Sequence, residues 1–211
     1  MISTINYSGL PSIDNIQKIS KAISDADAIL SQDWQYRYYS YQSQWSDFEE
    51  FCEMRDGEGS QMLILFHPKG CVINGMSHEH YPKNKEKITK GIPEIYREFI
   101  FGEPVNSIGT TFCIWINENG FWQTGELDTF DDGSKELLNI FDGNPQTYLE
   151  WAKEYYEEGI NINKNTLSVL QNIYQGIPLT RSMVFSFVDT LDDWNQLIDD
   201  LKEINYPFDF S

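Results

Sequence analysis

The sequence is poor in cysteine and in basic residues, and it contains no long hydrophobic run. Its 211 residues include 3 cysteines, Cys52, Cys71 and Cys113. Their odd number and wide spacing argue against a disulfide framework, so we expect reduced, buried thiols. No stretch approaches the roughly 18 apolar residues of a membrane helix, and residues 1–7 show neither a basic start nor an apolar core. We therefore expect a cytoplasmic protein that does not enter a membrane.

Basic residues are scarce, with 15 lysines and arginines against 33 aspartates and glutamates and a net charge of −18. Such a charge repels nucleic acid and anionic membranes and attracts basic proteins. The imbalance is greater in the C-terminal part, because residues 1–125 contain 16 acidic and 10 basic residues whereas residues 126–211 contain 17 and 5. An acidic surface also keeps an ordinary protein soluble, so both interpretations stay open.

Several well-defined catalytic motifs are absent as well. The sequence contains no GxxxxGK[ST], GxGxxG or GxSxG pattern, which removes the clearest nucleotide-binding and hydrolase signals. We therefore predict no cofactor and assign no catalytic residue. Aromatic residues, in contrast, make up 15% of the chain. They favour a well-packed fold with aromatic side chains left over for a surface site.

Hydrophobic periodicity predicts a helix followed by sheet-forming segments in the first part of the chain. Apolar residues after Ser12 recur on one helical face, and Ser12 is placed to cap that helix. Turn residues such as Asn119-Gly120 favour tight hairpins between short apolar runs. The expected elements are a helix at 12–30, a strand at 34–41, a hairpin at 62–74, a helix at 92–101 and a hairpin at 110–124.

After residue 125 the pattern changes to helices. They are predicted at 134–141, 144–156, 165–174 and 180–188, and a last helix follows the capping box Thr190-Leu191-Asp192-Asp193. This order indicates an α+β protein with a mainly antiparallel sheet built from hairpins, an N-terminal helix and a C-terminal run of helices. We expect a single domain over residues 1–211, with a soft boundary near residue 126.

The segment Ser77-His78-Glu79-His80-Tyr81 contains two of the three histidines. On a strand, the i, i+2 spacing would place His78 and His80 on one face, where they could bind a divalent metal. Zinc needs one or two further ligands and the HExxH spacing is absent, so no metal site is specified. His78, Glu79 and His80 are candidate binding residues, with a solvated loop as the alternative.

Acidic and aromatic residues occur together in two of the predicted C-terminal helices. Trp151 and Tyr155 are flanked by glutamates, and Asp192 and Asp193 precede the apolar stripe of the last helix. Carboxylates accelerate the encounter with a basic protein, and aromatic side chains supply buried anchors. These four residues are therefore candidate binding residues. The alternative is a core stripe with a solvated outer face.

Four short segments carry a resemblance to a known family. They are Met54-Arg55-Asp56-Gly57, Phe66-His67-Pro68-Lys69-Gly70, Gly75-Met76-Ser77-His78-Glu79 and Thr110-Thr111-Phe112-Cys113-Ile114-Trp115. Together they resemble a family of bacterial cytoplasmic proteins without an assigned activity, over residues 45–206. The resemblance implies a bacterial, cytoplasmic origin and supplies no catalytic residues.

Two functions follow from these observations as hypotheses. The first is a non-enzymatic, acidic protein-binding module, such as an immunity-type inhibitor of a basic protein, and it rests on the charge and the missing motifs. The alternative is a metal-dependent hydrolytic enzyme that uses His78, Glu79 and His80.

Overall fold

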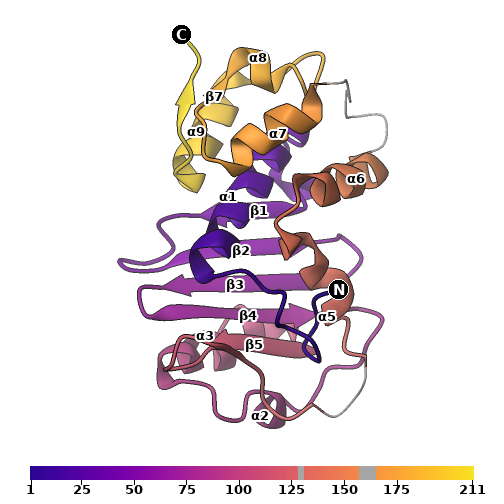
Figure 1. Cartoon of the computed structure of the whole chain (residues 1–211), viewed down its shortest axis with the longest axis vertical. Helices are drawn as coiled ribbons and strands as arrows, with labels where there is room; N and C mark the ends of the chain where they lie inside the picture. The colour runs from indigo at the N-terminus through magenta and orange to yellow at the C-terminus, as the bar shows by residue number, and fades with distance from the viewer. Residues whose placement is uncertain (128–130, 157–164) are drawn as a thin grey trace.

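The protein has an α+β fold in which one antiparallel sheet carries helices on both faces (Figure 1). The computed structural model describes residues 1–127, 131–156 and 165–211. In chain order the described elements are α1 (Ile13–Leu30), the 3-10 helix η1 (Trp34–Tyr36), β1 (Tyr39–Gln42), β2 (Glu50–Arg55), β3 (Gln61–His67), β4 (Gly70–Met76), α2 (Lys85–Ile88), η2 (Glu94–Tyr96), α3 (Arg97–Phe101), α4 (Val105–Ile108), β5 (Phe112–Ile116), β6 (Trp122–Gln123), α5 (Ser134–Leu138), η3 (Asn139–Asp142), α6 (Pro145–Tyr156), α7 (Thr166–Tyr174), β7 (Leu179–Thr180), α8 (Arg181–Val184), α9 (Trp194–Ile204) and β8 (Phe208–Asp209).

The first helix forms as its periodicity predicts. The Ser12 side chain accepts a hydrogen bond from the Asn15 amide and caps the helix. The apolar face of α1 is buried against the sheet and the C-terminal helices, with Ile16 and Ile23 fully inaccessible. The same helix also buries Asp25 and Asp27, which the apolar pattern does not predict.

The main sheet is a meander of six strands in the order β1-β2-β3-β4-β5-β6, with every neighbouring pair antiparallel. Both predicted hairpins are confirmed as β3–β4 and β5–β6. The sequence pattern does not predict β2, although its buried Phe51, Cys52 and Met54 pair in register with β1 and β3. The prediction of a mainly antiparallel sheet built from hairpins is therefore correct. A short parallel pair, β7–β8, lies apart among the C-terminal helices.

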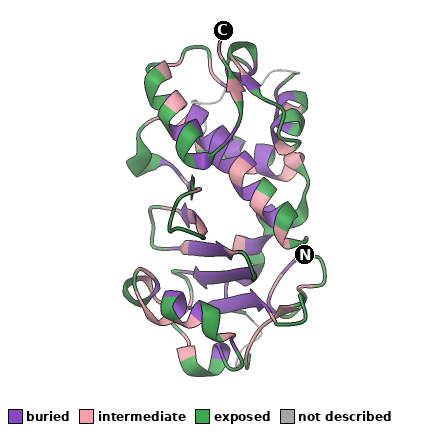
Figure 2. Ribbon diagram, turned by 90° about the vertical axis from the view of Figure 1, so that its left-hand side faces the viewer, coloured by how far each residue is buried: buried purple, intermediate pink, exposed green. Residues whose placement is uncertain are grey.

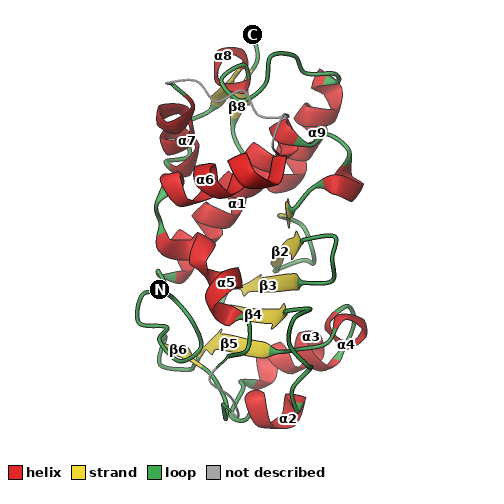
Figure 3. Cartoon of the chain, turned by 90° about the vertical axis from the view of Figure 1, so that its right-hand side faces the viewer, coloured by secondary structure: helices red, strands yellow, loops and turns green. Residues whose placement is uncertain are grey.

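Two hydrophobic cores lie on opposite faces of this sheet. Figure 3 shows α1, α5 and α6 on one side of the strands and α3 and α4 on the other. The first core joins the sheet to residues from both ends of the chain, from Ile2 to Tyr206. The second core is smaller and packs η2, α3 and α4 against β2 to β5. In Figure 2 the buried residues accordingly concentrate on the strands and on the inner helix surfaces.

The short helices of the second core leave part of their face of the sheet open. Residues of β1 do not belong to this core, and β2 contributes only Phe51. Ser40, Gln42 and Glu53, which share this face with Phe51, are only partly covered or exposed. The open area lies between α4 and the η1–α9 region, and it forms the floor of a cavity.

Several predicted elements differ from the structure in their bounds. The helix predicted at 180–188 is only α8 (Arg181–Val184), since Thr180 belongs to β7 and caps α8. The helices predicted at 92–101 and 134–141 each combine a short α-helix with a 3-10 helix. The pattern predicts one strand over residues 34–41, but Trp34–Tyr36 form a 3-10 helix because the Asp33 carboxylate accepts the Gln35 amide hydrogen and turns the chain. The last helix is capped by Asp193, and Thr190 does not cap it as the capping box predicts. The Asp193 side chain accepts hydrogen bonds from the backbone amides of Asn195 and Gln196.

The cysteines agree with a further expectation. All three cysteines are buried and unpaired. Burial raises the pKa of the Cys52 thiol to about 12, so it stays protonated at neutral pH. Within the described ranges, no helix combines the length and the apolar character needed to span a bilayer.

Candidate functional site

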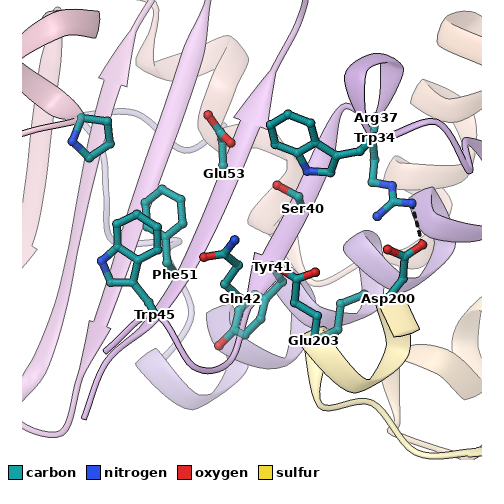
Figure 4. A pocket seen from close by; sticks show the side chains of 12 residues that line it. Trp34, Arg37, Ser40, Tyr41, Gln42, Trp45, Phe51, Glu53, Asp200 and Glu203 are labelled. Carbon is teal, nitrogen blue, oxygen red and sulfur yellow. Dashed lines mark hydrogen bonds and ion pairs between the residues drawn. The ribbon is translucent and has the colours of Figure 1, made fainter. Parts of the chain in front are cut away.

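The open part of the sheet forms the floor of a cavity of about 250 Å³. Ser40 pairs with Glu53 and Gln42 pairs with Phe51 across β1 and β2, so all four side chains project from the same face. Figure 4 shows the indoles of Trp34 and Trp45 on either side of this floor. We call this cavity the tryptophan pocket, and its lining residues include Trp34, Ser40, Gln42, Trp45, Phe51, Glu53 and Glu203.

Each indole of the tryptophan pocket is fixed by a neighbouring side chain. The Trp45 ring stacks on Phe51 with 4.4 Å between ring centroids and an interplanar angle of 23°. Trp34 lies under the guanidinium of Arg55, whose central carbon is 3.7 Å from the ring centroid, and Arg55 also donates a hydrogen bond to the Trp34 carbonyl. Trp34 and Trp45 nevertheless stay 53% and 40% exposed. Fixed but accessible aromatic surface is typical of a binding anchor.

Two carboxylates of the pocket are incompletely neutralised. Burial raises the pKa of Glu53, whose side chain is 18% exposed, and the nearby Arg55 guanidinium at 3.6 Å opposes this effect only in part. Glu203 lies at the rim, and its carboxylate has no hydrogen bond or ion pair within the part of the chain that the structure describes. A cation that entered the cavity would therefore meet an excess of negative charge.

The back of the pocket is closed by a buried ion pair between Arg37 and Asp200. Their side chains are 4% and 7% exposed and approach to 2.7 Å. The Arg37 side chain also donates a hydrogen bond to the Ser31 carbonyl at 3.1 Å. The Asp200 carboxylate accepts one from the side-chain amide of Gln196 at 3.1 Å. Because these polar groups are satisfied, the pair is a structural support and leaves ligand binding to the carboxylates in front of it.

The lining of the pocket combines polar, acidic and aromatic side chains. It contains a hydroxyl, an amide, carboxylates and aromatic rings, and it includes neither a histidine nor a cysteine. Ser40 is therefore without an adjacent imidazole that could activate it as a nucleophile. Aromatic faces next to carboxylates are suited to a cation, because the ring quadrupole and the negative charge attract it together.

The structure places the candidate metal residues in a turn and not on a strand. β4 ends at Met76, and His78 contacts Ser60 through Nδ1 at 2.7 Å while His80 contacts Ser77 through Nδ1 at 2.9 Å. The two imidazoles thus have different partners, and the predicted strand face that they would share does not exist. Glu79 is exposed in the same turn. Across the described ranges, no group of three or more His, Cys, Asp and Glu side chains is arranged to hold a metal ion.

His80 belongs to a polar network that ties three segments together. Its Nε2 atom lies 3.3 Å from the Asp131 carboxylate. Beside it, the hydroxyl of Thr4 donates to Asp132 at 2.6 Å and its amide donates to Ser134 at 3.0 Å. Ser77, which faces His80, is buried. The network joins the N-terminal segment, the turn after β4 and the start of α5, which is a structural role.

Trp151 and Tyr155 are placed together, as their spacing predicts. Their rings stack at 5.2 Å, and Trp151 also packs on Tyr38 at 4.5 Å. Trp151 lines a second cavity of about 300 Å³ that contains Glu136, Glu150 and Glu154 among its residues. These glutamates are exposed. Much of the Trp151 ring is used to attach α6 to β1, and its role in binding stays a prediction.

Asp192 and Asp193 lie at the start of α9 and do not line the tryptophan pocket. Asp193 is the helix cap, and its backbone exchanges two hydrogen bonds with the Gln32 side chain. Asp192 is exposed. The pocket instead uses Asp200 and Glu203 from the same helix. The binding roles of Asp192 and Asp193 stay predictions.

The sequence leaves open whether Trp34 and Trp45 line a pocket or fill the core, and it does not select them or Glu53 as site residues. The available signal is the alternation in β1 and β2, where Tyr39, Tyr41, Cys52 and Met54 face the first core and the residues between them are polar apart from Phe51. A polar face on a strand pair usually means solvent, so the pattern alone does not reveal a pocket.

No family model, curated protein or solved structure matches this chain. The family resemblance expected from the four short segments therefore stays a prediction. The function has to be argued from the site itself.

Proposed function

We propose that this chain is a non-enzymatic module that binds a basic protein and inhibits it by covering its cationic surface. The observation that supports it best is the tryptophan pocket, where two accessible indoles flank the carboxylates of Glu53 and Glu203. Tryptophan is enriched among the residues that dominate the energetics of protein interfaces, where the partner buries it.

The surroundings of the pocket support the same function. The segments that carry Trp34 and Trp45 also carry Tyr36 and Phe48, which are 64% and 75% exposed. Acidic residues lie in the same two segments, namely Asp33, Asp47 and Glu49. Aromatic anchors inside an acidic rim match a partner with a basic surface, and the net charge of −18 would accelerate its approach.

The proposal predicts a partner whose retention depends on Glu53. Wild type and Glu53→Gln are immobilised in parallel and exposed to a lysate of the organism that carries the gene, and retained proteins are compared by quantitative mass spectrometry. We expect a basic protein that is depleted about tenfold on Glu53→Gln, because a charge-assisted contact is lost. Its affinity for the wild type, measured with both components purified, is expected to fall as the salt concentration rises.

Glu118→Gln is the matched control. Glu118 is exposed near the turn between β5 and β6, at the opposite edge of the sheet from β1, and the substitution changes the net charge by the same amount. It is expected to retain the partner like the wild type. If no protein distinguishes wild type from Glu53→Gln, or if Glu118→Gln loses the partner equally, the pocket is not the binding site and the proposal is wrong.

A further inference from the structure

We infer that the tryptophan pocket receives an arginine side chain of the basic partner, with the guanidinium placed between Trp34 and Trp45 and opposite Glu53. The inference rests on the proposed function and adds the chemical group that the pocket recognises. It follows from the aromatic side chains on either side of the pocket, the acceptors on the floor and the charge balance of the lining residues.

The walls present aromatic surface that suits a planar cation. Phe51 fixes the orientation of the Trp45 ring, and Arg55 fixes that of Trp34. Arg55 also shows that an indole of this chain accepts a guanidinium stacked at 3.7 Å. A guanidinium stacks flat on aromatic rings, whereas an ammonium is compact and strongly hydrated. The walls therefore favour arginine over lysine.

The floor supplies hydrogen-bond acceptors in several directions. The carboxylate of Glu53 can accept two parallel hydrogen bonds from a guanidinium, and the Ser40 hydroxyl and the Gln42 amide oxygen lie on the same face of the sheet. None of these three side chains forms a hydrogen bond within the described ranges. Five guanidinium donors can use this set more completely than three ammonium donors.

The lining of the pocket carries an excess of negative charge. It contains three acidic residues, Glu53, Asp200 and Glu203, and one basic residue, Arg37. Arg37 is bound to Asp200, and Arg55 lies outside the lining, stacked on Trp34 and 3.6 Å from Glu53. An arginine from a partner would reduce this excess. It would also keep its charge in a partly desolvated cavity, because its pKa lies far above neutral.

The ionisation of Glu53 makes the affinity of the pocket for arginine depend on pH. Burial raises the pKa of Glu53, and a cation bound beside it would lower that pKa again. Arginine binding would then release protons at pH values at which Glu53 is partly protonated in the absence of arginine. Arginine affinity is therefore expected to rise with pH through this range in the wild type and to be flatter in Glu53→Gln.

The test is an NMR titration of the full chain, 15N-labelled, with blocked single amino acids. N-acetyl-arginine N-methylamide is compared with the corresponding lysine and citrulline compounds, while the indole Nε1–H signals are followed. We expect saturable shifts for Trp34 and Trp45 with arginine, affinity several-fold weaker with lysine, and no saturable shift with citrulline, which has nearly the same shape without the charge. Glu53→Gln is expected to weaken arginine binding about tenfold, and Glu118→Gln to leave it unchanged.

The outcomes separate this inference from the proposed function. Equal affinity for arginine and citrulline, equal or tighter binding of lysine, or shifts confined to other tryptophans would overturn the arginine assignment. Those results would leave the proposed function intact if a basic protein were still retained in a Glu53-dependent way. Arginine binding at Trp34 and Trp45 without any Glu53-dependent protein partner would instead support the pocket chemistry and count against the proposed function.

Discussion

At the scale of single residues, buried carboxylates on α1 stand out. Asp27 accepts hydrogen bonds from the Tyr39 amide at 2.7 Å and from the Tyr148 hydroxyl. The Tyr39 amide faces away from β2, so Asp27 satisfies the unpaired edge of β1 and links it to α6. Asp25 is also fully buried, and its carboxylate oxygens have no hydrogen-bond partner within the described ranges.

Because Asp27 is buried, we predict that the free energy of unfolding falls as the pH rises towards neutrality, opposite to the effect of an ordinary ion-paired carboxylate. Burial raises the pKa of Asp27 to about 7, although the hydrogen bonds from the Tyr148 hydroxyl and the Tyr39 amide and the positive charge of Arg37 lower it. Between the ordinary carboxyl pKa of about 4 and this value, the folded state binds more protons than the unfolded state. The stabilisation is therefore complete below about pH 4 and is lost as the pH rises through about 7.

The corresponding measurement is the free energy of unfolding of wild type and Asp27→Asn at several pH values. We expect the wild type to lose on the order of a few kcal/mol from this group between about pH 5 and pH 8, and Asp27→Asn to show a smaller slope. Asparagine cannot ionise and can still accept one of the two hydrogen bonds. Identical slopes for the two proteins would show that Asp27 does not titrate in this range.

At the scale of elements, α9 completes the site. Asp193 caps α9, and the apolar side of this helix packs on α1. Asp200 and Glu203, on another side of α9, line the tryptophan pocket. The backbone carbonyl of Glu203 accepts the Ser43 amide hydrogen just after β1, which fixes the helix end against the strand. The position of α9 and the shape of the pocket are therefore coupled.

Breaking the Arg37–Asp200 pair tests how much it contributes to holding α9 in this position. Arg37→Met leaves the Asp200 carboxylate buried without its cation, so we expect a loss of about 3–5 kcal/mol in the free energy of unfolding. Asp200→Leu in addition should recover much of this loss, since no uncompensated charge remains. Urea denaturation measures both variants.

Lys202→Met is the control for this experiment, because Lys202 pairs with Asp199 on the exposed face of α9. Exposed pairs contribute little, so we expect an almost unchanged unfolding curve. A similar loss for Arg37→Met and Lys202→Met would mean that burial of the first pair carries no special weight.

At the scale of the whole molecule, the two ends of the chain share one core. The first core includes Ile16 and Ile23 of α1 together with Leu170 of α7 and Leu201 of α9. The described residues after 126 thus cover apolar surface that the preceding residues present. The soft boundary predicted near residue 126 stays a prediction that a truncation can test.

A fragment of residues 1–125 is expected not to fold cooperatively. Without α7 and α9, the outer apolar face of α1 would be exposed to water, and each fully buried aliphatic side chain left exposed loses about 1.5–3 kcal/mol. Circular dichroism during thermal unfolding and the dispersion of amide NMR signals measure the outcome. A sharp transition with dispersed signals would show that residues 1–125 are an independent domain.

The sequence by itself determined the elements whose evidence is local. The stripe after Ser12, the turn residues of the two hairpins and the helical spacing of Trp151 and Tyr155 each report short-range geometry, and the structure confirms those elements. The α+β class followed from their order. The acidic charge likewise followed from composition alone.

Only the tertiary structure decided where the site lies. Trp34, Glu53 and Glu203 come from three separate segments, and their meeting depends on strand register and on the docking of α9. The strand β2 also escaped prediction, because its residues are recognisable as a strand only beside β1 and β3. Long-range contacts of this kind carry no local pattern. For the same reason, only the fold gave the His78 and His80 side chains different partners and placed Asp27 against the edge of β1.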